Sequence, residues 1–267
     1  MNAVFLGAAA CAVLGLGASC ASTPPPPPIA VDEVPLREAI DGARAAIRDF
    51  DLDGLRVAAQ QLALVEPASN ADAAARDYWR GAALFNAVLV PRDDDGDVAS
   101  ATSAATDALE ETVARRESDP ESHAMLATLI GRRIKANPFS AITLGSAFKK
   151  HRKASADARS TNPRVAYLEG VGRLKRAGDP DAVRDALDVL LDAERLFALE
   201  AQAERGFAAP DWGRGHNLMF IGEAHERLGE IGLAADAYER AIEASPELER
   251  AQDGYRRCRN ETESVSR

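Results

Sequence analysis

Histidines and cysteines are the side chains of this chain that could bind a metal ion or act as a nucleophile. The four histidines are His123, His151, His216 and His225, and no two of them are three or four residues apart. That spacing is the one by which a single helix presents two metal ligands, so no helical metal site is predicted. The chain also lacks a GxSxG motif and a glycine-rich phosphate loop. We therefore expect no enzyme, no bound metal and no cofactor.

An acidic run at residues 93–97 has some of the residues of a calcium-binding loop. Placing Gly96 at the invariant glycine of such a loop puts Pro91 at the first ligand position and Thr102 at the last. Neither side chain suits its position, so the run is better interpreted as a solvated loop. Its aspartates would then stabilise the start of a helix near Asp97.

The first 19 residues contain no charged side chain and consist mainly of alanine, glycine, leucine and valine. This short apolar segment is typical of a signal peptide (1–19), although a membrane-spanning helix is the alternative. The residues Ala18 and Ser19 at the end of this segment, with Cys20 after them, resemble a bacterial lipoprotein box, in which lipid is attached to Cys20. Ordinary cleavage after Cys20 or Ala21 would instead release the protein. Residues 20–33 would form a tether stiffened by the prolines 24–28.

Cysteine usage excludes a disulfide framework in the exported chain. Cys11 lies in the signal peptide and Cys20 would carry lipid, which leaves Cys258 without an intrachain partner. Cys258 lies among arginines at 256, 257 and 259, and their charge could lower the pKa of its thiol. The alternative is an ordinary residue near the end of the chain.

Composition restricts the fold and the partner. The formal net charge is −10, so general binding of nucleic acid is not expected, because contact with phosphates needs a basic surface. Aromatic residues make up only 5% of the chain and alanine is abundant, which favours closely packed helices over strands.

Apolar residues recur at three- and four-residue intervals along most of the chain, which predicts helices. Capping residues precede prolines at Asp119-Pro120, Asn162-Pro163, Asp179-Pro180 and Ser245-Pro246, and each pair predicts a helix start. The predicted helices span 34–50, 53–66, 70–89, 97–117, 120–136, 139–160, 163–177, 180–204, 212–228, 231–245 and 246–259.

The segment 218–246 has small, aromatic and proline residues at the intervals of a helical-hairpin repeat. Gly222 and Ala234 would lie where two helices cross closely, Gly229 would end the first helix, Tyr238 would fill the layer between helices, and Pro246 would start the next one. These intervals match the tetratricopeptide (TPR) repeat, about 34 residues long. We predict an all-α, irregular TPR-like array of antiparallel helical hairpins (an α-solenoid) over 34–260, and a disordered tail at 261–267.

Several motifs strengthen this resemblance over residues 120–246. Together they are similar to a bacterial family of exported, lipoprotein-type TPR proteins to which no biochemical activity is assigned. A looser likeness, of architecture alone, is to the T-component lipoproteins of TRAP transporters. The motifs are Ile134-Lys135-Ala136-Asn137-Pro138, Leu144-Gly145, Asn162-Pro163-Arg164-Val165 and Pro210-Asp211-Trp212-Gly213.

By resemblance to TPR grooves, the first helix of each repeat would line a concave surface that binds a peptide or a partner helix. The alternative is that these positions face solvent or pack against the helix predicted at 180–204. The candidate partner-binding residues are Leu168, Lys175, Arg176, His216, Met219, Glu223, Glu226 and Arg227.

A second candidate surface is a basic belt at 132–153, within a segment from Ser122 to Ala156 that has no acidic side chain. It would contact anionic lipid headgroups or an acidic partner, or its charges would be neutralised by acidic residues of adjacent hairpins.

These features together predict a non-catalytic scaffold of the bacterial cell envelope. It would bind an unidentified envelope protein or peptide and would be held at a membrane by its lipid anchor, facing the periplasm. The alternative is a ligand-binding accessory subunit of a TRAP-type transporter. The sequence does not predict an oligomeric state.

Overall fold

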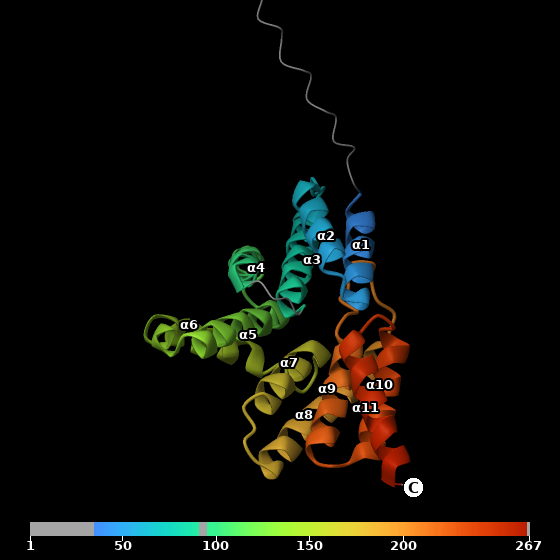
Figure 1. The fold of residues 1–267 in the computed structure, drawn as a ribbon. Helices are drawn as coiled ribbons and strands as arrows, with labels where there is room; N and C mark the ends of the chain where they lie inside the picture. The colour runs from blue at the N-terminus through green and yellow to red at the C-terminus, as the bar shows by residue number, and fades with distance from the viewer. Residues whose placement is uncertain (1–34, 91–94, 266–267) are drawn as a thin grey trace, which may run out of the picture. The chain divides into compact units, whose positions relative to one another are not determined.

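The computed structural model describes residues 35–90 and 95–265, which are helical through most of their length and contain no strand. The prediction of an all-α array of helical hairpins is confirmed (Figure 1). Cys20 and the segments predicted to be a signal peptide (1–19) and a tether (20–33) lie outside the described residues. The elements are α1 (Leu36–Asp49), α2 (Leu52–Leu64), α3 (Asn70–Leu89), α4 (Asp95–Arg115), α5 (Pro120–Ala136), the 3-10 helix η1 (Pro138–Ser140), α6 (Ala141–Ala156), α7 (Pro163–Leu174), α8 (Pro180–Glu200), α9 (Arg214–Arg227), α10 (Ile231–Ala244) and α11 (Glu249–Val265).

Side-chain caps fix the start of three helices at the predicted prolines. Asp119, Asn162 and Asp179 each accept a hydrogen bond from a backbone N–H in the first turn of α5, α7 and α8. The fourth junction is different, and the prediction that Pro246 starts the last helix is wrong. A turn follows Ser245, in which the N–H of Leu248 donates to the carbonyl of Ser245 at 3.1 Å. The helix α11 begins only at Glu249 and continues to Val265, into the range expected to be a tail.

Glycines allow the last three helices to pack closely around one tyrosine. A Cβ atom added to Gly222 in α9 would lie 2.8 Å from Cδ1 of Tyr238 in α10, and one added to Gly254 in α11 would lie closer still to the same ring. Ala234 is fully buried, and Gly229 has a φ of 74° just after α9 ends. The roles expected for Gly222, Gly229, Ala234 and Tyr238 are therefore confirmed.

Helices that follow one another in the chain pack together along most of it, but α6 and α7 are an exception. Extensive contacts join α5 to α6 and α7 to α8, whereas α7 packs against α5 rather than against α6. The α5–α6 pair thus diverges from the α7–α11 helices (Figure 1). This divergence leaves an open space between the two groups of helices.

No helix in the described part of the chain has both the length and the apolar character needed to cross a membrane. Cys258 is buried in α11, and burial, the largest effect, together with Glu226 raises the pKa of its thiol. The neighbouring arginines therefore do not make this thiol a low-pKa nucleophile.

The packing around Tyr238 gives the first prediction. Gly222→Ala should lower the free energy of unfolding by about 1–3 kcal/mol, because the added methyl group overpacks the tyrosine ring. Gly232→Ala in α10 is the matched control, since a Cβ there meets no atom within 4 Å, and it should cause no loss. Urea denaturation measures both. Equal effects of the two substitutions would contradict the close packing of α9 on α10.

Candidate partner-binding groove

A groove of about 1970 Å³ lies between the α5–α6 pair and the helices α7, α9 and α11, with the ends of α1 and α3 closing one side. The groove exists because α6 and α7 diverge. Since these two helices do not pack against each other, their side chains do not fill the space between them. Much of its lining is apolar. The large apolar residues of the lining include Phe85, Leu89, Phe148, Leu168, Met219 and Phe220.

Five of the eight candidate residues line this groove. Leu168 and Met219 contribute apolar surface, Lys175 and Arg176 lie at the end of α7, and His216 lies in α9. The structure brings these residues together from two helices that are separated by about 40 residues of chain.

The other three candidates do not belong to the groove lining, and their charged groups make contacts between helices. Glu223 pairs with Lys175 at 2.7 Å and Arg250 at 2.5 Å, and so joins α9 to α7 and α11. Glu226 accepts hydrogen bonds from Tyr238 at 2.5 Å and Arg257 at 2.9 Å. Arg227 donates to the carbonyls of Leu174 and Ala177 at 2.6 and 2.7 Å, which caps the end of α7. Their charged atoms are therefore occupied within the protein.

Several cations that line the groove are not paired with a carboxylate of the described chain, residues 35–90 and 95–265. The side chains of Lys135, Lys149, Arg152 and Arg176 make no hydrogen bond or ion pair with any of these residues, and Arg152 contacts the ring of Phe148. Burial, then the charges of Arg152 and Arg173, lower the pKa of Arg176. Arg152, Arg173 and Arg176 are thus held close together, and Glu169 compensates part of their charge. An anionic group would compensate the rest. Lys149 and Arg152 belong to α6, and the resemblance to TPR grooves predicts no lining residue in this helix.

His216 is buried beside the groove. Its ring packs at 61° against Phe50, with centroids 4.5 Å apart, and its Nε2 atom has no hydrogen-bond partner. Burial, with a smaller effect of Arg250, lowers the pKa of His216 to about 4. The ring is therefore neutral near pH 7.

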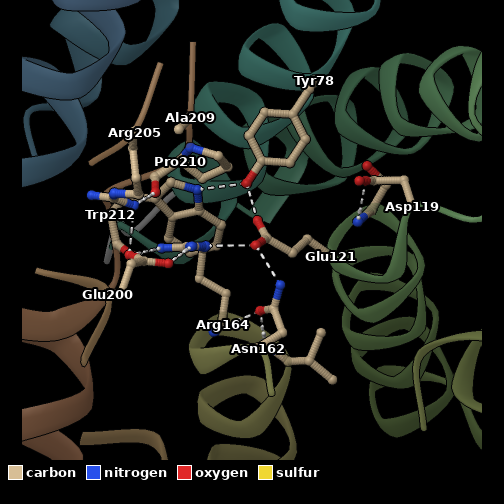
Figure 2. A network of polar contacts seen from close by, with 12 residues as sticks. Tyr78, Asp119, Glu121, Asn162, Arg164, Glu200, Arg205, Ala209, Pro210 and Trp212 are labelled. Atoms are coloured by element: carbon tan, nitrogen blue, oxygen red, sulfur yellow. Dashed lines mark hydrogen bonds and ion pairs between the residues drawn. The ribbon is translucent and has the colours of Figure 1, made fainter. Parts of the chain in front are cut away.

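A buried polar network fixes the helices on which the groove depends. Arg164 at the start of α7 is 2% exposed and reaches two carboxylates, as Figure 2 shows. Its Nε donates to Glu121 of α5 at 2.8 Å, and its Nη1 donates to Glu200 of α8 at 3.0 Å. Glu121 also accepts from Asn162 at 2.8 Å and from the hydroxyl of Tyr78 in α3. The network thereby joins four helices, α3, α5, α7 and α8.

The long loop at 201–213 is tied to the same network. The indole of Trp212 donates to the hydroxyl of Tyr78 at 3.0 Å, and Arg164 donates to the carbonyl of Trp212 at 3.3 Å. Trp79 donates to the carbonyl of Ala208 at 2.8 Å, and Arg44 donates to that of Ala209 at 3.0 Å. The loop therefore connects α9 to the helices α1 and α3.

The fold also pairs two histidines that are 28 residues apart. Their Nδ1 atoms are 2.8 Å apart, and Nε2 of His123 lies 2.8 Å from the carbonyl of Glu117. Since a carbonyl only accepts, Nε2 of His123 carries its hydrogen, and Nδ1 accepts from His151. Burial, with smaller effects of His123 and Lys150, lowers the pKa of His151 to about 4. Within the described ranges, no three metal-ligating side chains come together.

Comparison of the chain with protein-family models, with characterised proteins and with solved structures finds no match.

The burial of His216 predicts a pH dependence of stability. Unfolding restores the pKa of this side chain from about 4 to its ordinary 6.5, so the unfolded state binds more protons between these values. The free energy of unfolding should therefore fall as the pH drops from 6.5 to 4, by roughly 2–3 kcal/mol from this group. His151 acts in the same direction.

Urea denaturation at pH 7 and pH 4, for the wild type and for His216→Gln, isolates this contribution. Any cost of the substitution that does not depend on pH cancels in the difference between the two pH values. The loss of stability on acidification should be smaller in the variant. The same loss in both proteins would show that His216 is not held neutral by the fold.

Proposed function

We propose that this protein is a non-catalytic scaffold that binds an acidic, partly apolar segment of another protein in the groove. The observation that carries the proposal is an apolar lining combined with four cationic side chains that make no hydrogen bond or ion pair with the described residues, Lys135, Lys149, Arg152 and Arg176. Apolar side chains of the bound segment would lie on Leu168, Met219 and Phe220. Its carboxylates would lie near the cations at the opening.

The volume of the groove favours a polypeptide over a small molecule. Small-molecule sites usually measure about 300–1,000 Å³ and enclose most of the ligand. The groove is larger, about 1970 Å³, and is lined mainly by α5, α6, α7, α9 and α11, with the ends of α1 and α3 beside them. The alternative, a ligand-binding accessory subunit of a transporter, is supported by the unpartnered Nε2 of His216. One buried polar atom provides little of the polar recognition that a small ligand needs, so we rank this alternative second.

The envelope location is part of the same proposal and rests on the sequence of residues 1–28. A signal peptide would export the chain, and lipid on Cys20 would hold it at a membrane. The TPR-like intervals at 218–246 support a role in binding, because stacked helical hairpins commonly present grooves to peptides and partner helices.

Site-specific crosslinking in the native envelope tests the proposal. A photoreactive phenylalanine analogue at Gly145 would point into open space in the groove, because a Cβ there meets no atom within 4 Å. Gly232 in α10 is an equally open glycine outside the groove lining, and it serves as the matched control. We expect the probe at position 145 to capture a defined protein that the probe at position 232 does not.

Charge reversal then tests the recognition. Arg152→Glu combined with Arg176→Glu should reduce the crosslinked product at position 145 by roughly tenfold or more, because like charges facing each other across an interface are costly. Arg184→Glu in α8, outside the groove lining, should leave it unchanged. The same product from positions 145 and 232, or an undiminished yield in the double variant, would contradict binding of an acidic segment.

A further inference from the structure

The turn between α5 and α6 exposes two large apolar side chains next to each other. Phe139 in η1 is 82% exposed and Ile142 in the first turn of α6 is 85% exposed. No other large apolar side chain of the described residues is more than 64% exposed. Neither residue lines the groove, so the proposed partner site does not account for them.

Cations share the surface with these apolar side chains. Ile142, Lys150 and Lys153 are separated by eight and eleven residues, which places them on one face of α6. This face borders the groove: the lining includes Ala141, Gly145, Phe148, Lys149 and Arg152 of the same helix but not Ile142, Lys150 or Lys153. Arg133, in the last turn of α5, is also exposed and also lies outside the groove lining.

These charges are not neutralised within the described chain. Arg133, Lys150 and Lys153 make no hydrogen bond or ion pair with any residue in 35–90 or 95–265. The sequence has no acidic side chain from Ser122 to Ala156, although the whole chain carries a net charge of −10. The alternative weighed from the sequence, that acidic residues of adjacent hairpins neutralise the belt, therefore does not hold for these three.

We propose that this surface, defined by Phe139, Ile142, Lys150, Lys153 and Arg133, docks on an anionic phospholipid membrane. Phe139 and Ile142 would enter the interfacial region of the bilayer, while the cations would contact the headgroups. The net negative charge of the chain would be repelled by such a membrane, so attraction confined to the hairpin would also orient the protein.

A membrane accounts for this surface better than an acidic protein does. A stable protein–protein interface buries about 800 Å² on each partner and centres on side chains held in pockets. Two apolar side chains at the end of a hairpin do not supply such a surface. They do match the pattern of interfacial segments, in which a few apolar residues insert and neighbouring lysines bind anionic lipid.

Tryptophan fluorescence of the full-length protein tests the proposal. Phe139→Trp introduces an exposed reporter, whereas the two native tryptophans, Trp79 and Trp212, are buried. Vesicles that contain phosphatidylglycerol should shift the emission of this variant to shorter wavelength, and phosphatidylcholine vesicles should shift it much less. Leu199→Trp at the end of α8, 64% exposed in the native residue, is the control that should not shift. Any binding of vesicles through the N-terminal segment is the same in the Phe139→Trp and Leu199→Trp proteins, so it does not affect the comparison.

Charge reversal in the Phe139→Trp background shows whether the cations are responsible. Lys150→Glu with Lys153→Glu should raise the lipid concentration needed for half of the shift by at least roughly twentyfold, since each basic residue near an anionic surface contributes about fivefold in binding. Arg184→Glu with Arg195→Glu on α8 should leave it unchanged.

Three results would overturn the proposal. One is an emission at position 139 that vesicles leave unchanged. Another is an equal shift for position 139 and position 199. The third is a shift with polyglutamate but not with phosphatidylglycerol, which would identify an acidic protein as the partner. Because Lys150 and Lys153 lie outside the groove, failure here would leave crosslinking at Gly145 unaffected, and the two proposals are tested separately.

Discussion

The buried guanidinium of Arg164 is the interaction on which the arrangement of the helices most depends. Burial alone would lower the pKa of this group, but Glu121, Tyr78 and Glu200 raise it above its ordinary value. The charge is therefore compensated on two sides by carboxylates, which in turn accept from Asn162, Tyr78 and Arg205. Such a network is costly to break, because removing one member leaves an uncompensated charge in the interior.

The position of this network explains why a groove exists. Arg164 begins α7, and its bond to Glu121 holds that end of α7 on α5. Because α7 packs on α5, it does not pack on α6, the helix that precedes it in the chain. The groove lies along the side of α6 that α7 leaves uncovered. The loop at 201–213, held through Trp212, places α9 on the opposite wall. The polar contacts thus set the distance between α6 and α9, and apolar side chains fill only part of the space between these helices.

Local features of the sequence predicted most of the fold. Asp119, Asn162 and Asp179 act over the first turn of a helix, so their effect is visible in a few neighbouring residues. Ser245-Pro246 has the same pattern and starts no helix, because a turn after Ser245 follows instead. The small residues of 218–246 were informative because Gly222 meets Tyr238 within one hairpin.

The candidate site was only partly predictable, because its contacts join distant residues. Glu121 and Arg164 are 43 positions apart, and no local pattern marks either of them as a partner of the other. Glu223 and Arg227 have the charges of binding residues, but both are occupied by contacts between helices. In the sequence, Lys149 and Arg152 are part of the basic belt at 132–153. They line the groove because α6 does not pack against α7. The spacing of the repeat residues in the sequence does not predict that separation.

Distance measurement across the groove tests most directly whether the Arg164 network sets its width. Spin labels at positions 149 and 247, both exposed and on the groove lining, would be placed in a chain whose native cysteines are replaced. Arg164→Lys keeps the positive charge, but one ammonium group cannot span Glu121 and Glu200 as the guanidinium does. We expect one narrow distance distribution in the parent and in the surface control Arg184→Lys, and a broad or shifted one in Arg164→Lys. An unchanged narrow distribution in Arg164→Lys would show that the network does not set the width of the groove.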